Sequence, residues 1–138
     1  MQIRTADFGT DYADIRRIRI EVFVEEQGVP EELELDERDT ACTHVLAVDA
    51  DGEAVGTGRI DVDGKIGRVA VRAAARGTGV GRAMMDVLHR LARERGLTEV
   101  WCHAQISAAP FYERLGYARL GERFFEAGIE HVEMRRPA

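Results

Sequence analysis

The chain has 138 residues, of which 45% are hydrophobic and 32% charged, and its formal net charge is −6. A chain of this length can bury a hydrophobic core without disulfides or metals, and its acidic balance argues against nucleic acid or an anionic membrane as the main partner. No stretch looks like a signal peptide or approaches the roughly 20 apolar residues that span a bilayer, so we expect one cytoplasmic domain over residues 1–138.

The N-terminal segment predicts a short strand followed by an amphipathic helix. Residues Gln2 to Ala6 form the strand, and Thr10 or Asp11 caps a helix that runs to about Val24. Apolar residues recur three or four apart in this helix and define its buried face: Tyr12, Ile15, Ile18 and Val22.

An acidic connection follows the helix. Gly28 and Pro30 end the helix, and the segment through Thr40 breaks any simple period, so it predicts a second short helix or a loop. The carboxylates between Glu25 and Glu37 have two interpretations: they attract a cationic substrate, or they belong to a solvated loop.

From Cys42 the hydrophobic period changes to two, which predicts three antiparallel strands. They span Thr43 to Asp49, Ala54 to Val62 and Lys65 to Val71, and Asp-Gly pairs form the two hairpin turns between them. Cys42 itself and Cys102 lack the Cys-x-x-Cys spacing of zinc and redox sites. We therefore expect free thiols and no metal.

The remaining chain predicts a helix, a strand, a second helix and a closing hairpin. The strand that follows the first of these helices should run parallel to the Lys65 to Val71 strand, because a helical crossover joins them. The expected elements are a helix from Gly79 to Arg95, a strand from Thr98 to Gln105, a helix from Ala109 to Gly116, and strands from Tyr117 to Phe125 and Ile129 to Arg135.

A glycine-rich turn joins the third strand of the meander to the long helix. Gly77, Gly79 and Gly81 can turn their amides toward one point at a helix N-terminus, and Arg76 and Arg82 bracket them with guanidinium groups suited to phosphate. The spacing excludes a dinucleotide-binding turn, because Arg82 stands where its third glycine belongs, and no Gly-Lys-Ser/Thr sequence of a P-loop occurs.

Two motifs resemble the GCN5-related N-acetyltransferase (GNAT) superfamily. The first, Arg76-x-x-Gly79-x-Gly81, is similar to its pyrophosphate-binding signature. The second runs from Gln105 through Tyr112 to Tyr117 and is similar to an Asn-x-x-Ala-x-x-x-Tyr-x-x-x-Gly-Phe segment, with Gln for Asn and Tyr for Phe. The order of the elements is also that of the superfamily, so the resemblance covers nearly the whole chain.

The N-terminal half adds a finer resemblance. The segments Arg19 to Pro30, Glu34 to Asp39 and Thr43 to Ala47 are similar to the ElaA/YjcF-like branch and, more faintly, to the longer acyl-homoserine-lactone synthases. In either case the resemblance places Glu26, Glu34 and Asp36 at an acceptor pocket.

The resemblance implies an α/β (α+β) GNAT fold: a central mixed, mostly antiparallel twisted sheet of about seven strands, with helices on both faces and a splay between strands 4 and 5. It implies transfer of an acetyl group from acetyl-CoA to a small-molecule amine, with no metal, and it allows a homodimer. The donor-binding residues that it implies are Val69, Ala70 and Val71 for pantetheine and the carbonyl, and Arg76, Gly77, Thr78, Gly79, Val80, Gly81 and Arg82 for the pyrophosphate.

Tyr112 is the expected general acid. Phe111 and Leu115 are i, i+4 partners that can anchor its helix to the core, which turns Tyr112 to a different face, where it can protonate the departing thiolate. The base that deprotonates the acceptor stays open among six candidates: Glu21, Glu25, Glu26, His103, Glu126 and His131. Two other hypotheses are a non-catalytic acyl-CoA sensor of the same fold and a protein of this fold without coenzyme A affinity.

Overall fold

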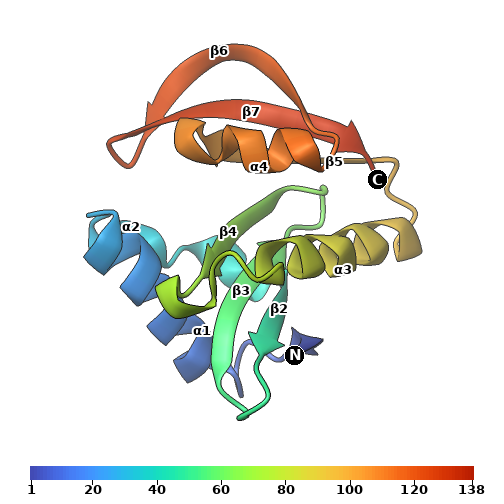
Figure 1. Ribbon diagram of the computed structural model, residues 1–138. Helices are drawn as coiled ribbons and strands as arrows, with labels where there is room; N and C mark the ends of the chain where they lie inside the picture. Colours follow the sequence, from blue (N-terminus) through green and yellow to red (C-terminus); the bar gives the residue numbers. More distant parts are fainter.

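The computed structural model of the chain describes all 138 residues and contains seven strands. Figure 1 shows the C-terminal strands and α4 above the N-terminal strands and helices. Along the chain the elements are β1 (Gln2–Ala6), α1 (Tyr12–Arg19), η1 (Ile20–Glu26), α2 (Glu31–Glu34), η2 (Glu37–Thr40), β2 (Thr43–Val48), β3 (Ala54–Ile60), β4 (Ile66–Val71), η3 (Ala73–Ala75), α3 (Val80–Glu94), β5 (Glu99–Gln105), η4 (Ile106–Ala108), α4 (Ala109–Arg114), β6 (Ala118–Glu126) and β7 (Ile129–Pro137).

The strands form two antiparallel sheets that meet at one point. The first sheet has the order β1-β2-β3-β4 and the second has the order β5-β7-β6. A single parallel bridge joins Lys65, the residue before β4, to Trp101 of β5. Beyond it the two strands separate. The predicted mixed, mostly antiparallel arrangement with a splay between strands 4 and 5 is therefore confirmed.

Helices cover both faces of the first sheet, so every residue of its inner strand β3 is buried. On one face, Ile15 and Ile18 of α1 pack with Leu46 of β2. On the other face, α3 approaches β3 so closely that a Cβ on Gly56 would lie 3.0 Å from Met84 Cε. A Cβ on Gly58 would lie 3.3 Å from a methyl carbon of Leu88. Glycine in the middle of this strand lets the helix seat against the sheet.

The first helix differs from its prediction in three ways. Its α-helical part ends at Arg19 and continues as a π-helix through Glu26, which hydrophobic periodicity does not distinguish from α-helix. Tyr12 is 36% exposed rather than buried. Asp11 occupies the N-cap position, but its carboxylate accepts hydrogen bonds from Arg4 and from the Asp7 amide instead of capping the helix.

Both cysteines are free thiols, as expected. Burial raises the pKa of Cys42 to about 11 and that of Cys102 to about 12, so neither thiol is activated as a nucleophile. No helix in the chain combines the length and the apolar character needed to cross a bilayer.

Candidate active site

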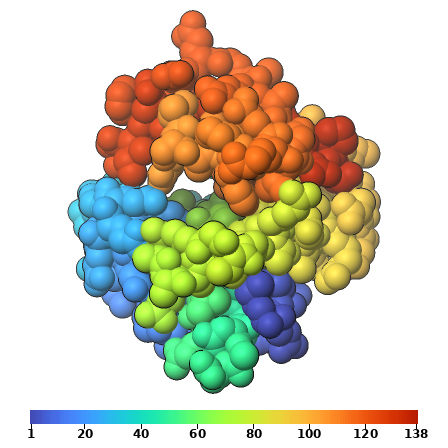
Figure 2. All heavy atoms as spheres, viewed as in Figure 1, coloured from blue at the N-terminus to red at the C-terminus, as the bar shows by residue number.

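A cavity of about 480 Å³ opens where β4 and β5 separate. Side chains from η1, α2 and β4 line one side, and side chains from β5, α4 and the β6–β7 hairpin line the other. Figure 2 shows an opening between the orange and red C-terminal segments and the blue and green N-terminal segments. The cavity therefore lies between the two sheets, at the place where the sequence predicts acyl transfer.

The edge of β4 that faces the splay carries backbone groups without a strand partner. Ala70 pairs with Thr57 of β3, and the Arg72 amide donates to Val55 of the same strand. Because backbone groups alternate between the two edges of an antiparallel strand, Val69 and Val71 direct theirs toward β5. This geometry separates the three predicted residues: Val69 and the Val71 amide face the gap without a strand partner, the Val71 carbonyl oxygen accepts from the Arg76 side chain, and Ala70 engages in ordinary sheet pairing.

A β-bulge in β4 lies beside these residues. The register shifts between Thr57 and Arg59, so that Arg68 and Val69 both lie opposite Gly58. Arg68 has a φ of 52°, an uncommon conformation for a residue with a side chain. The Arg68 guanidinium donates a hydrogen bond to the Glu34 carbonyl oxygen at 2.9 Å. This bond connects β4 to α2 at the cavity wall.

The glycine-rich turn forms a cradle of unpaired amides at the start of α3. Gly77 and Gly79 have φ values of 77° and 87°, and nothing lies within 4 Å of a Cβ built on either residue. The amides of residues 77–79 donate no backbone hydrogen bond, and those of residues 80–82 lie in the first helical turn, where no intrahelical acceptor exists. The open cradle and the helix dipole fit a pyrophosphate.

The two arginines of this motif have different surroundings. Arg76 donates to the Val71 carbonyl oxygen and to the Glu26 carboxylate, each at 2.8 Å. Arg82 has no ion pair within the chain, so its guanidinium is available to a ligand. Gly81 connects the turn to α4, because a Cβ there would lie 3.3 Å from the Phe111 ring.

Tyr112 reaches the same cavity from α4. Its residue is 8% exposed, and its ring packs edge-on against Phe111 and Tyr117, with centroids 5.1 and 5.3 Å away. Its hydroxyl has no hydrogen-bond partner within the chain, and the residue lines the cavity together with Val69. Burial raises the pKa of Tyr112 above its ordinary value, so the phenol keeps its proton at neutral pH.

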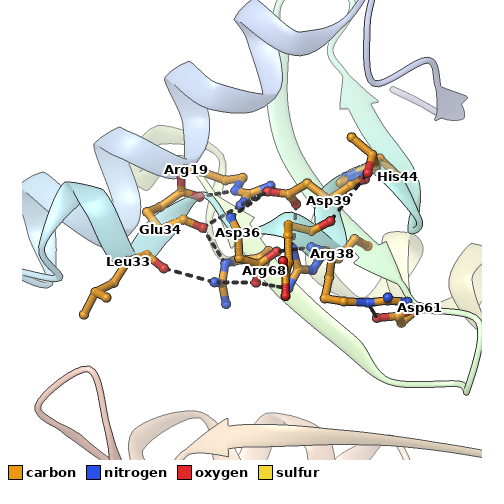
Figure 3. A network of polar contacts seen from close by, with 12 residues as sticks. Arg19, Leu33, Glu34, Asp36, Arg38, Asp39, His44, Asp61 and Arg68 are labelled. Atoms are coloured by element: carbon orange, nitrogen blue, oxygen red, sulfur yellow. Dashed lines mark hydrogen bonds and ion pairs between the residues drawn. The ribbon is translucent and has the colours of Figure 1, made fainter.

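A buried ion network, which sequence reasoning missed, forms the wall opposite the second sheet (Figure 3). Arg19 is fully buried and bonds the carboxylates of Glu34 and Asp39. Arg59 of β3 bridges Asp39 and Asp36, at 2.6 and 2.8 Å. The acidic connection is therefore only partly solvated: arginines from α1 and β3 neutralise Glu34 and Asp36, whereas Glu25, Glu31, Glu32 and Glu37 are exposed.

The arginines also set the acidity of the network. The hydrogen bond from Arg59 lowers the pKa of Asp36 to about 2, and that from Arg38 lowers the pKa of Asp61 to about 2. Burial alone would raise the pKa of Asp39, but hydrogen bonds from Arg19 and Arg59 outweigh it, and the net shift is downward. These carboxylates remain ionised and are poor proton acceptors.

The shift at Asp36 predicts a loss of stability in acid. Its folded pKa of about 2 lies below the ordinary aspartate value of 3.8, so the unfolded chain binds more protons as the pH falls. The contribution is complete above about pH 4 and disappears toward pH 2. In Asp36→Asn, we expect the unfolding free energy to fall less between pH 5 and pH 3 than in the wild type, as measured by urea denaturation. Asp51→Asn, at an exposed carboxylate without an ion pair, should lose as much unfolding free energy between pH 5 and pH 3 as the wild type. Equal losses in all three proteins would contradict the prediction.

The structure separates the six candidate bases into two groups. Glu21 and Glu26 pair with Arg72 and Arg76 outside the cavity, and Glu25 lies in a separate shallow depression. The other three line the cavity: His103, Glu126 and His131. Of the acidic residues expected at the acceptor pocket, Glu34 and Asp36 line the cavity and Glu26 does not. Gln105, the residue that replaces the usual Asn, donates to Gln27 at 2.7 Å across the cavity.

A signal for the missed network is present in the sequence. Arg19 stands four residues after Ile15 and three before Val22, which places it on the buried face of its helix. Arg59 lies within a strand that is otherwise apolar or small. A buried arginine needs carboxylate partners, and the acidic connection supplies them.

Comparison with known proteins agrees with this geometry. A sequence model of the acetyltransferase (GNAT) domain matches residues 11–137. The chain is 39% identical over 123 residues to the uncharacterized N-acetyltransferase YjcF of Bacillus subtilis, covering 86% of this chain and 87% of YjcF. A solved acyl-CoA N-acyltransferase from Pseudomonas aeruginosa superposes with a TM-score of 0.86 at 30% identity, covering 98% of both chains. Escherichia coli ElaA superposes with a TM-score of 0.83 at 27% identity, covering 99% of both chains.

The family match spans nearly the whole chain, and the solved structures superpose over almost its whole length. The chain therefore belongs to the GCN5-related N-acetyltransferase (GNAT) superfamily.

Proposed function

We propose that the protein transfers an acetyl group from acetyl-CoA directly to the primary amine of a small acceptor. The observation that carries the proposal is the arrangement of three features around the splay of β4 and β5: the amide cradle of residues 77–82 that follows β4, the unpaired edge of β4 at Val69, and Tyr112, which lines the cavity together with Val69. The names of the relatives, an N-acetyltransferase and an acyl-CoA N-acyltransferase, support the same reaction class.

The donor would lie along the β4 edge. The pyrophosphate would accept hydrogen bonds from the amides of residues 77–82 and a charge-assisted bond from Arg82. The pantetheine arm would pair with the Val71 amide and with Val69 as an additional strand, because these groups face the gap between β4 and β5. This orientation directs the thioester toward the cavity and toward Tyr112.

Direct transfer needs a nucleophile, an oxyanion donor and an acid. The neutral amine attacks the thioester carbonyl carbon from the cavity, and a backbone N–H of β4 stabilises the developing oxyanion by about 3 kcal/mol. The C–S bond then breaks with its electron pair on sulfur, and Tyr112 donates its proton to the thiolate. The cavity volume of 480 Å³ lies within the usual range for small ligands, about 300–1,000 Å³.

Acetyl-CoA should raise the thermal stability of the protein. Ligand at about 100 times its dissociation constant contributes roughly 2.7 kcal/mol, provided that it binds only the folded state. We expect Arg82→Gln to weaken acetyl-CoA binding about tenfold, because it removes the unpaired guanidinium at the cradle. Differential scanning fluorimetry with acetyl-CoA, and with free CoA for comparison, measures both effects.

Arg90→Gln is the matched control, because Arg90 lies on the same helix and pairs at the surface with Glu94. It should bind acetyl-CoA as the wild type does. A screen of primary amines for thiol release then tests the transfer reaction. Absence of any stability shift at millimolar acetyl-CoA would refute the donor assignment, and binding without CoA release would favour a non-catalytic sensor.

A further inference from the structure

A cluster of two imidazoles and one carboxylate lies on the cavity wall that the second sheet forms. His103 on β5, Glu126 at the end of β6 and His131 on β7 come from three different strands and line the same cavity as Tyr112. Glu126 lies between the two rings: one oxygen is 3.2 Å from His103 Nδ1, and the other is 3.7 Å from His131 Nε2. The proposed acceptor amine would enter this space.

Every other carboxylate that lines the cavity is already held by arginine. Glu34 is bound by Arg19, Asp36 by Arg59 and Arg68, and Asp61 by Arg38. A carboxylate in such a pair resists protonation, because taking up a proton would break the pair. Glu126 has no arginine partner, and its only ion-pair neighbours are His103 and His131. The proton-accepting capacity of the cavity is therefore concentrated in this cluster.

The hydrogen bonds indicate which nitrogen is free to accept a proton. His131 Nδ1 lies 2.7 Å from the Ile129 carbonyl oxygen, which only accepts, so the neutral ring carries its proton on Nδ1 and leaves a lone pair on Nε2. His103 Nδ1 can likewise donate to Glu126 and hold that carboxylate in place. A proton taken up at His131 Nε2 then forms an imidazolium beside the Glu126 carboxylate.

We propose that His131 Nε2 removes the proton from the acceptor ammonium, with Glu126 stabilising the imidazolium and His103 positioning Glu126. This assignment rests on the proposed acetyl transfer. One ammonium proton passes to His131 and later to solvent, and the freed lone pair forms the C–N bond. A second proton leaves the nitrogen as the amide forms and replaces, through solvent, the proton that Tyr112 gives to the CoA sulfur. The sum is amide, CoA thiol and one released proton.

The test uses primary alkylamines, such as phenethylamine, each paired with its β,β-difluoro analogue. An alkylamine is almost wholly protonated at pH 7, because its ordinary pKa is about 10. The fluorines withdraw electron density, so most of the analogue is already neutral and needs no base before attack. Rates of CoA release with each pair are measured for the wild type, His131→Gln, Glu126→Gln and the control Glu122→Gln, an exposed residue on β6.

We expect His131→Gln to lower kcat/KM about 100-fold with the alkylamine and less than tenfold with its fluorinated analogue. Glu126→Gln should change the ratio of the two kcat/KM values, alkylamine to fluorinated analogue, in the same direction. Glu122→Gln should leave this ratio unchanged. An unchanged acetyl-CoA stability shift in each variant shows that it folds and binds donor. Equal losses with both amines, or no loss, would overturn the assignment while the proposed function stands. If none of the amines tested makes the wild type release CoA, the proposed function and this inference both fall.

Discussion

Replacing Arg19 by methionine should destabilise the folded protein by about 3–5 kcal/mol, because the substitution leaves the buried Glu34 carboxylate unpaired and leaves Asp39 with Arg59 as its only ion-pair partner. The Arg19 guanidinium donates to both oxygens of Asp39, at 2.9 and 3.1 Å, to the Glu34 carboxylate, and to the Glu34 carbonyl oxygen at 2.7 Å. Glu34 and Asp39 are 1% and 2% exposed, so water cannot replace the lost donors. One Glu34 oxygen already lacks a partner in the intact network.

Urea denaturation at pH 7 measures the loss, with Arg38→Met as the control. Arg38 also forms a bidentate arginine–aspartate pair, with Asp61, but its side chain is 50% exposed. Solvent screens such a pair, so its removal should change the unfolding free energy far less. Similar losses in the two variants would mean that burial does not set the strength of the Arg19 network.

The two halves of the proposed donor site were predictable because each is local in sequence. The cradle is encoded by glycines at alternate positions before an amphipathic helix, and α3 begins at Val80 within one residue of the predicted start. Tyr112 follows from a proline-initiated helix that Gly116 ends, and α4 has that form. Backbone conformation and helix termini depend on nearest neighbours, so one chain suffices to predict them.

The proposed acceptor side could not be predicted in the same way, because it depends on pairing between distant segments. Arg19 meets Asp39 twenty residues away, and Gln105 reaches Gln27 across 78 residues. The register of β5 with β7 brings His103 opposite Glu133 and Gln105 opposite His131, and a one-residue slip would turn these side chains to the other face. Local charge patterns do not specify such pairings.

Replacing Tyr112 by phenylalanine should lower kcat about 100-fold or more and leave acetyl-CoA binding nearly unchanged. The substitution removes only a hydroxyl, and the ring can keep its edge-on packing with Phe111 and Tyr117. Because that hydroxyl has no partner within the chain, thermal stability should also change little. Loss of the proton donor would slow expulsion of the thiolate, which single-turnover measurement of CoA release detects directly.

Tyr117→Phe is the matched control, because it removes a hydroxyl from the neighbouring ring and both residues are buried. Tyr117 bonds His89 Nε2 at 2.7 Å and does not line the cavity, so its loss should cost about 1 kcal/mol of stability and spare turnover. Tyr112→Phe should therefore lose turnover and keep stability, whereas Tyr117→Phe should lose stability and keep turnover. Unchanged turnover in Tyr112→Phe would remove the general-acid role, and solvent or another group would then have to protonate the departing thiolate.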